Sequence, residues 1–361
     1  MKCNKIKLQN FRNIENAEIE LCDGVNIFYG NNAMGKTNAL EAIYLFANGK
    51  SFRASSDKEL INFSKEMSYV KMYCEDRVRP QDMEIKLVKG SRKLCYRNGV
   101  NIKKMYDFVG YFRAVLFSPE HLSVIKDGPA ERRLFLDRAI CQLKPIYLSS
   151  LQKYNNILNQ RNMLLKNYEN DKENFNRTIE LWSAYLAREA SLISKERYEY
   201  VKQLNIHVGD FFNDMTDGRE NTCLEYNKLM TEDEYLQKLT HNIEKEIQSG
   251  TTLYGIHKDD IDIYLNKREA RAYCSQGQQR CLALAMKLGE GEISRQTTGE
   301  YPVFLFDDIF SELDFKRKEY VTKGINKCQV IITSCDKSGL EKFAGNVIEV
   351  SNGRYFPKNM I

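Results

Sequence analysis

Hydrophobic and polar positions alternate along much of the first 120 residues. The alternation covers residues 5–21, where a short polar turn divides it, and returns at 70–74, 83–87 and 94–96. Neighbouring side chains of a strand point to opposite faces of a sheet, so a period of two indicates half-buried strands. Asn98-Gly99, a dipeptide favoured in tight hairpin turns, follows the last run. The pattern predicts an antiparallel sheet, unlike a simple doubly wound fold.

Other apolar runs predict strands of a different kind. They occupy residues 25–29, 113–117, 302–306 and 330–332, and residues 261–265 form one more alternating run. Uniformly apolar runs are typical of strands buried on both faces. After the first run, residues 37–47 place Leu40, Ile43 and Ala47 on one helical face. We therefore expect α/β structure at both ends of the chain.

The middle of the chain has the spacing of helices. From about residue 130 to 207 there are few glycines, and apolar residues recur at helical intervals. The residues expected to form the apolar stripe are Leu148, Leu151, Leu158, Leu181, Tyr185 and Leu192. We expect two or three long helices, broken near residues 167–174, with arms of about 30 residues or fewer and roughly 45 Å. Trp182 is expected in their core.

One more amphipathic helix is expected after Thr231. Thr231 and Glu234 have the spacing of a capping box, and Gly250 ends the helical pattern. The apolar positions of this helix are Leu236, Leu239, Ile243 and Ile247. We expect a mostly helical lobe at 131–249, inserted into a discontinuous domain formed by 1–130 and 250–361.

Composition narrows the class of protein. With 361 residues, 42% hydrophobic, the chain is long enough for a sizeable core, and its net charge of +5 permits a nucleic-acid partner without indicating one. Ten scattered cysteines and four histidines form no metal-binding pattern, so we interpret the cysteines as reduced core residues. No stretch is apolar enough to be a signal or membrane segment, so we expect a cytoplasmic location and no membrane partner.

The first candidate site is a phosphate-binding loop that fits G-x-x-x-x-G-K-[ST]. Glycines let successive backbone N–H groups point at phosphate oxygens, Lys36 adds a charge near the β- and γ-phosphates, and Thr37 offers a hydroxyl to Mg²⁺. A strand precedes the loop and a helix follows it, as the motif requires. The loop residues are Gly30, Asn31, Asn32, Ala33, Met34, Gly35, Lys36 and Thr37. A nucleoside triphosphate with Mg²⁺ is the predicted ligand.

Two later stretches extend this site. The strand at 302–306 ends in Asp307 and Asp308, an arrangement suited to holding Mg²⁺ with the first carboxylate and orienting an attacking water with the second. Ser275 and Gly277 precede a helix predicted from Cys281 to Leu288, and backbone amides at a helix start bind anions. The second stretch is far from the phosphate loop in sequence.

Taken in order, these motifs resemble the ATP-binding-cassette ATPases. The order is the phosphate loop, the Ser275-Gln276-Gly277-Gln278 helix start, the acidic strand and Ser311-Glu312-Leu313-Asp314. Residues 8–13 and the loop ending in Asn38 are similar to the chromosome-maintenance and DNA-repair branch, which commonly has glycine where Ala33 stands. The implied fold is an α/β ATPase head of the ABC type with an antiparallel β subdomain and an inserted α-helical lobe.

The resemblance narrows further to the RecF family of bacterial recombination mediator ATPases, over essentially the whole chain. The stretches that carry it are 117–122, 128–137, 255–260, 275–280 and 307–314. The short helical lobe also fits, because the chromosome-condensing relatives carry far longer coiled coils.

The resemblance implies an ATPase that dimerises on DNA when ATP is bound, at double-stranded DNA and at junctions with single strands. It implies that the protein helps RecO and RecR to load RecA at single-strand gaps, in SOS-type repair and in replication. Slow, DNA-stimulated ATP hydrolysis is expected to release the dimer from DNA, and no nuclease activity is expected. The resemblance also implies a role for each site residue. Lys36 binds the phosphates, Thr37 and Asp307 form the Mg²⁺ shell, and Asp308 activates the attacking water. Ser275, Gly277 and Gln278 reach across the dimer, Asp314 lies at the dimer seam, and Arg12 lies near the nucleotide.

Two departures from cassette ATPases predict slow turnover. The strand at 330–332 ends in Thr333-Ser334-Cys335 where transporter cassettes have a histidine, so a hydroxyl is expected to sense the γ-phosphate. No glutamine stands out for the loop that usually contacts Mg²⁺.

Several alternatives stay open at this point. Arg12 is also compatible with a surface turn, and Arg132, Arg133 and Arg138 fit either DNA phosphates or a solvated helix face paired with Glu131 and Asp137. The stretch with His257, Asp259 and Asp260 is interpreted as a structural loop near the active site. The rival functions are a transporter-energising cassette, a small-molecule kinase, and another SMC-like or ABC-type ATPase that does not act on DNA.

Overall fold

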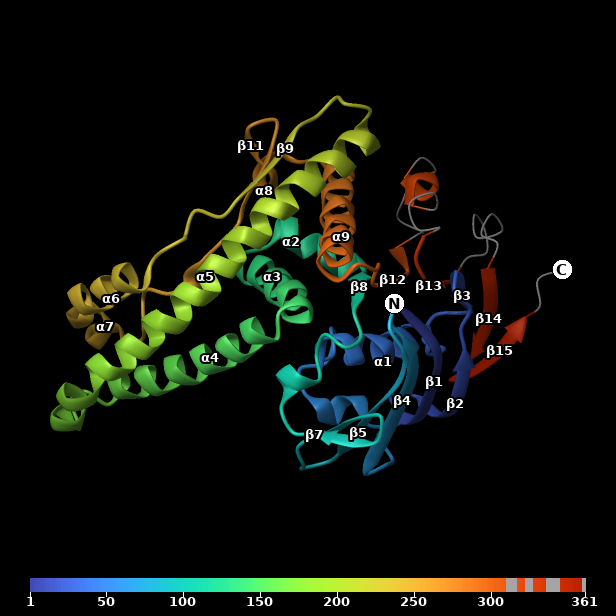
Figure 1. The fold of residues 1–361 in the computed structure, drawn as a ribbon, viewed down its shortest axis with the longest axis horizontal. Coiled ribbons are helices and arrows are strands. Elements are labelled where there is room, and N and C mark those ends of the chain that lie inside the picture. The colour runs from blue at the N-terminus through green and yellow to red at the C-terminus, as the bar shows by residue number, and fades with distance from the viewer. Residues whose placement is uncertain (310–316, 322–326, 336–344, 359–361) are drawn as a thin grey trace.

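The computed structural model describes residues 1–309, 317–321, 327–335 and 345–358 (Figure 1). Its centre is a six-stranded sheet of order β15-β14-β3-β13-β12-β8. Its strands are β3 (Val25–Tyr29), β8 (Ala114–Phe117), β12 (Val303–Asp307), β13 (Val330–Ser334), β14 (Gly345–Ser351) and β15 (Arg354–Lys358). All neighbours pair in parallel except β15, which is antiparallel to β14. The buried strands predicted near residues 25, 113, 302 and 330 are confirmed.

The two faces of this sheet belong to two different cores. Val303 and Leu305 of β12 pack in one core with helix α1 (Lys36–Asn48). Phe304 and Phe306, which point to the opposite face, pack in the other core with helix α9 (Gln276–Thr298). A strand covered on both faces reads as continuously apolar, which explains the pattern seen in the sequence.

The second sheet is antiparallel and lies beside α1 (Figure 1). Its order is β2-β1-β4-β5-β6-β7. Its strands are β1 (Lys2–Phe11), β2 (Ile14–Glu20), β4 (Met67–Glu75), β5 (Pro80–Val88), β6 (Leu94–Arg97) and β7 (Val100–Ile102). Asn98 and Gly99 join β6 to β7 with φ values of 48° and 75°, as a two-residue hairpin of the expected type requires. The antiparallel subdomain is confirmed.

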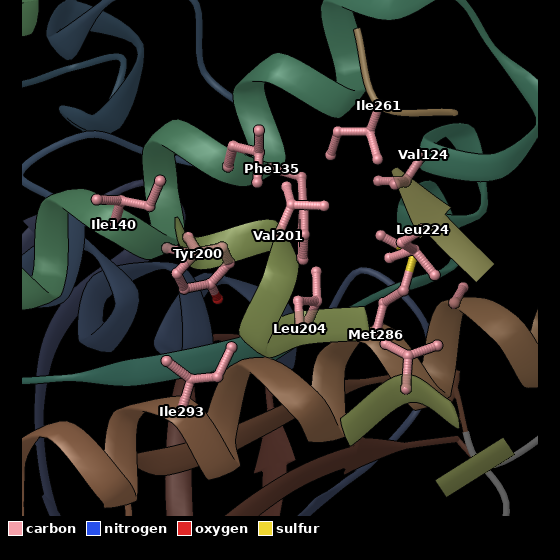
Figure 2. Packing of buried hydrophobic residues seen from close by; sticks show 14 of the residues in the cluster. Val124, Phe135, Ile140, Tyr200, Val201, Leu204, Leu224, Ile261, Met286 and Ile293 are labelled. Carbon is pink, nitrogen blue, oxygen red and sulfur yellow. The ribbon is translucent and has the colours of Figure 1, made fainter. Parts of the chain in front are cut away.

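A long helical arm projects from this head (Figure 1). It consists of α3 (Pro129–Leu143), α4 (Pro145–Lys166) and α5 (Lys172–Thr216). The predicted break near 167–174 is confirmed. The predicted arm length is wrong for α5, which has 45 residues, about 68 Å at 1.5 Å per residue. Only part of α5 runs along α4, because its C-terminal part packs against α9 instead (Figures 1 and 2).

Half of the predicted apolar stripe is on the wrong face of α5. Leu181, Tyr185 and Leu192 are about half exposed, and Trp182 is only half-buried rather than in the core. The buried face carries Phe175, Ile179, Leu186, Ala190, Ile193, Tyr200, Val201 and Leu204. Both sets of positions have helical spacing, so periodicity alone could not select the face that α4 and α9 cover.

Figure 2 shows how this arm joins the head. Tyr200, Val201 and Leu204 of α5 lie between α3, which contributes Phe135, and α9, which contributes Met286. The buried core is therefore continuous from the helical arm to the central sheet. The boundaries expected for the inserted lobe stay a prediction.

The remaining elements are short. The helix expected after Thr231 is two helices, α6 (Glu232–His241) and α7 (Ile243–Ser249), which meet at Asn242. The capping box of Thr231 and Glu234 is confirmed. The other elements are a sheet of β9 (Thr222–Glu225), β10 (Asp262–Leu265) and β11 (Arg268–Glu269), helices α2 (Ser123–Lys126) and α8 (Ala270–Tyr273), and 3₁₀ turns η1 (Asp57–Leu60), η2 (Met105–Asp107), η3 (Pro119–Leu122) and η4 (Ile256–Lys258).

None of the ten cysteines is paired in a disulfide, and the reduced state stays a prediction. Their expected place in the core is wrong for some, since Cys22 and Cys335 are exposed. None of the helices in the described ranges has both the length and the apolarity needed to cross a membrane.

Candidate nucleotide-binding site

The phosphate loop lies between β3 and α1, as its motif requires. Glycine is needed at Gly30, because a Cβ there would lie 2.2 Å from the carbonyl oxygen of Val350. Gly35 caps α1 with φ of 111°, which L side chains rarely adopt. The Lys36 side chain is buried, and its Nζ donates to the carbonyl oxygens of Gly30 and Asn31 at 2.7 and 2.8 Å. The lysine is therefore held inside the curve of the loop.

Thr37 and the acidic strand meet directly, although 270 residues separate them. Thr37 Oγ1 donates to Asp307 Oδ1 at 2.8 Å. Thr333 Oγ1 donates to the same oxygen at 2.8 Å and accepts from the backbone N–H of Asp308 at 2.9 Å. Side chains from the start of α1 and the end of β13 thus converge on one carboxylate at the end of β12.

Thr333 is the first of the two hydroxyl residues at the end of β13, where a hydroxyl is predicted to sense the γ-phosphate. Its side chain is fully buried, and its hydrogen bonds go to the two acids. The register of β13 with β12 sets Thr333 beside Asp307, and the contact of a hydroxyl with the γ-phosphate stays a prediction. Thr333 therefore positions the acidic pair.

The two acids have different environments. Burial raises the pKa of Asp307, and the hydroxyls of Thr333 and Thr37 act in the opposite direction. Asp308 follows the end of β12 with φ of 54°, a left-handed conformation that aspartate tolerates better than most residues. That turn directs the chain away from the strand immediately after Asp307.

Arg12 belongs to an ion cluster on the phosphate-loop helix. Its guanidinium donates to both carboxylate oxygens of Glu41 at 2.9 and 2.7 Å. Arg53 also donates to Glu41 at 2.7 Å, and to Asn38 Oδ1 at 2.8 Å. The Glu41 side chain is fully buried, and its pKa is lowered, since bonds from Arg12, Arg53 and Ser51 outweigh the opposing effect of burial.

Sequence reasoning missed Glu41 and Arg53. Glu41 lies four residues after Thr37, a position from which a helical side chain shares the face of the threonine. That spacing was the available signal for Glu41, whereas Arg53 enters through a loop.

Further contacts fix the outer side of the loop. Asn13 donates to the carbonyl oxygen of Ala33 at 3.2 Å and accepts from Asn38 at 2.7 Å. Tyr355, from the far end of the chain, donates to the carbonyl oxygen of Gly35 at 2.8 Å. Ala33 has φ of 63°, so the position where the resemblance implied glycine is left-handed here. The alanine retains the loop shape under local strain.

The predicted signature segment forms the start of α9. Ser275 is the N-cap, and a capping box joins it to Gln278 through bonds of 3.3 and 2.7 Å. The helix runs on to Thr298, well beyond the end predicted at Leu288. Ser275 is exposed, Gly277 is half-buried, and this end of α9 lies apart from β3 and α1 in Figure 1.

Other candidates are placed elsewhere or lie outside the described residues. Asp314 is in the latter group. His257 is in a structural loop, as expected, but its ring contacts Tyr154 of α4 at 2.6 Å rather than the phosphate loop. Burial lowers its pKa to about 4. No cluster of three or more metal-ligating side chains exists among the residues that the structure describes.

Two of the three arginines on α3 make hydrogen bonds within the chain. Arg132 is buried and donates to Asp260 at 2.6 and 2.8 Å. Arg133 donates to the carbonyl oxygen of Asp259 at 2.7 Å. Both side chains hold the 259–260 loop against α3, so the interpretation as a solvated helix face paired with Glu131 and Asp137 is wrong for them.

The geometry suits a nucleotide with a divalent cation. A hydroxyl and a carboxylate 2.8 Å apart are hard oxygen donors of the kind that Mg²⁺ binds together with phosphates. Lys36 and the loop amides supply the positive surface for phosphate oxygens. The arrangement is therefore suited to binding a nucleoside triphosphate at one edge of the central sheet.

Comparison with known proteins agrees with this geometry. The family described as "RecF/RecN/SMC N terminal domain" matches residues 2–354. A protein of Clostridium botulinum strain Eklund 17B named DNA replication and repair protein RecF is 37% identical, with 96% of this chain and 98% of that protein aligned. The chain belongs to the RecF family. A RecF of Lachnoclostridium phytofermentans is 39% identical over 95% of this chain and 94% of its own.

Solved structures place the fold with the RecF family too. A RecF recombination mediator bound to ATP, described as part of the RecFOR pathway, matches with a TM-score of 0.90 and 34% identity over 99% of both chains. A second RecF structure gives 0.92 and 32%, covering 99% of this chain and 98% of the other. An SMC head bound to a ScpA domain matches at 0.58 with 16% identity, which shows a shared fold alone. The predicted ABC-type head of an SMC-like, ATP-binding ATPase is confirmed.

Proposed function

We propose that this chain is an ATP-dependent DNA-binding protein of recombinational repair and replication-fork maintenance, working as a homodimer that closes when ATP binds. The observation that carries the proposal is that the described residues assemble one half of an ATP site and leave Ser275 apart from it. Lys36 is bonded inside the phosphate loop and Thr37 is bonded to Asp307, while Ser275 is exposed at a distant helix start. In a closed dimer, Ser275, Gly277 and Gln278 of one copy complete the site of the other, and Asp314 lies at the seam.

Within that site each side chain has one task. Lys36 leaves its loop carbonyls for the β- and γ-phosphates, Thr37 and Asp307 hold Mg²⁺, and Asp308 orients the attacking water. Mg²⁺, when bound, neutralises phosphate charge. Arg12 acts indirectly, since its guanidinium is engaged by Glu41. Hydrolysis is slow because β13 ends in hydroxyl side chains, Thr333 and Ser334, where transporter cassettes have a histidine.

The biological setting follows from the relatives. RecF proteins named for DNA replication and repair, and for the RecFOR pathway, support binding to duplex DNA and to single-strand gaps. They support RecO and RecR as partners in loading RecA, with hydrolysis releasing the dimer and with a cytoplasmic site of action.

DNA affinity in three nucleotide states tests the proposal. We expect tight binding of a gapped duplex with ATP, and weak binding with ADP or after Lys36→Arg, with melting temperature checked to show that the variant folds. Equal DNA affinity in all three cases contradicts the proposal, and ATP-dependent dimers that ignore DNA favour an ATPase that does not act on DNA.

A further inference from the structure

A cleft with an excess of basic side chains separates the antiparallel sheet from the helical arm. Its volume is about 520 Å³. One wall is formed by residues before β6 and after β7, the other by α3 and α4, and the loop after α1 closes one end. In Figure 1 this is the region between β7 and α4. Its cationic residues, here named the basic cleft, are Lys50, Arg92, Lys93, Lys103, Lys104 and Arg138.

The cleft concentrates nearly all of the chain's net charge. Its six cations face two carboxylates, Asp57 and Asp137, which leaves an excess of four positive charges. The whole chain of 361 residues carries +5. The residues outside the cleft therefore sum to a net charge of +1, and the cleft is a site of concentrated positive charge.

Both acids are already engaged. Asp57 pairs with Lys93 at 3.0 Å, and Asp137 pairs with the buried Arg197 at 2.8 Å. Within the described ranges, no ion pair joins Lys50, Arg92 or Arg138 to a carboxylate, and the same is true of Lys103 and Lys104. Five like charges around one cleft repel each other, so a polyanion in the cleft relieves an unfavourable arrangement.

The distribution of the charges favours a nucleic-acid backbone over an acidic protein segment. The cations come from three separate parts of the chain and four of them, Lys50, Arg92, Lys103 and Lys104, are exposed at the mouth. Lysines with long flexible stems suit a row of phosphates, which need charge rather than a fixed bidentate geometry.

We infer that the basic cleft is a phosphate-backbone contact surface for DNA. This inference rests on the proposed function and assigns DNA contacts to one face of the chain. It leaves Arg132 and Arg133, which are bound internally, out of that surface and retains Arg138. The contact is independent of base sequence, because lysine–phosphate contacts carry no sequence information.

The salt dependence of DNA binding tests the inference. The full chain, with ATP and Mg²⁺, is titrated with a gapped duplex at several salt concentrations. For Lys103→Ala with Lys104→Ala, the slope of log affinity against log salt is expected to fall by about 1.8 for each cleft in contact, with about 60-fold weaker binding at 0.1 M salt. Lys103→Arg with Lys104→Arg keeps the charges and should keep the slope.

A matched control removes two exposed lysines from the far end of the arm. Lys238→Ala with Lys245→Ala deletes the same charge from α6 and α7 and should leave the slope unchanged. ATP binding measured on all variants should equal that of the unaltered chain.

The outcomes separate the two proposals. If the unaltered chain binds DNA in an ATP-dependent way but the cleft variant keeps its slope, the cleft inference is overturned, and an acidic protein surface becomes the better occupant. If the control variant loses as much slope as the cleft variant, general charge explains the binding and the inference is again overturned. If the unaltered chain shows no ATP-dependent DNA binding, the proposed function itself fails.

Discussion

The phosphate-loop region and the start of α9 are both expected to contact ATP, but they are built in opposite ways. Around the loop, Lys36 donates to the carbonyl oxygen of Gly30, and the hydroxyls of Thr37 and Thr333 both donate to Asp307. At α9, the exposed Ser275 is bonded to Gln278 of its own helix. One region is organised before any partner arrives. The other presents a helix start on the surface, which is the arrangement that a composite site between two copies requires.

The largest expected effect comes from mixing two defective chains. Lys36→Ala and Ser275→Arg should each lower the ATPase rate at least about 100-fold, since each removes one half of every site. In a symmetric dimer, the mixed pair has one site with both defects and one intact site. An equal mixture should therefore recover about a quarter of the unaltered rate, because half of the dimers are mixed.

The readout of that mixing is steady-state ATP hydrolysis at fixed total protein. ATP binding by isolated Ser275→Arg chains, measured by calorimetry, serves as the control and should be retained. A mixture as inactive as its components would show that the two halves of the site do not come from two different chains.

A smaller effect is expected on the stability of the folded chain, because Asp307 is held in a buried position before any nucleotide binds. Because burial raises its pKa in the folded chain, the folded state binds more protons than the unfolded state just above the ordinary aspartate range. The contribution of Asp307 to the free energy of unfolding is thus most favourable at low pH. The stability of the folded chain falls as pH rises from the ordinary aspartate pKa through the raised pKa of Asp307. Asp307→Asn should remove this dependence and raise stability at neutral pH by about 0.5–2 kcal/mol.

Denaturant unfolding of the nucleotide-free chain at a series of pH values measures this. The asparagine variant should also lose Mg²⁺-dependent ATP binding, which shows that the charge serves function at some expense of stability. Ser275→Ala, at the exposed half-site, is the matched control and should leave the pH profile unaltered. Lower stability of Asp307→Asn at neutral pH would contradict the argument.

The smallest effect is at Ala33. Its φ of 63° is left-handed, and glycine adopts this conformation without the clash of a Cβ. Ala33→Gly should stabilise the chain by about 0.5–1 kcal/mol, since relief of strain exceeds the added entropy of the unfolded chain. Thermal unfolding measures the gain. Gly24→Ala, where φ is not positive and a Cβ meets no atom within 4 Å, is the reference for a change without strain.

Local chemistry was enough to predict much of the molecule. The phosphate loop, the acidic strand, the N-cap Ser275 and the Asn98-Gly99 hairpin each depend on residues close together in sequence. Alternating and uniform apolar runs correctly separated the antiparallel sheet from the buried central one. These features follow from backbone geometry and period, which neighbours in the chain impose.

Only the tertiary structure decided what distant segments do to one another. It selected the buried face of α5, since two faces of that helix were equally apolar in spacing. It brought Thr333 beside Asp307 through strand register, joined Glu41 to both Arg12 and Arg53, and gathered the lysines of the basic cleft from three segments. By itself, the sequence determined which groups could bind phosphate. Long-range packing determined which of them are held in place and which remain available at the surface.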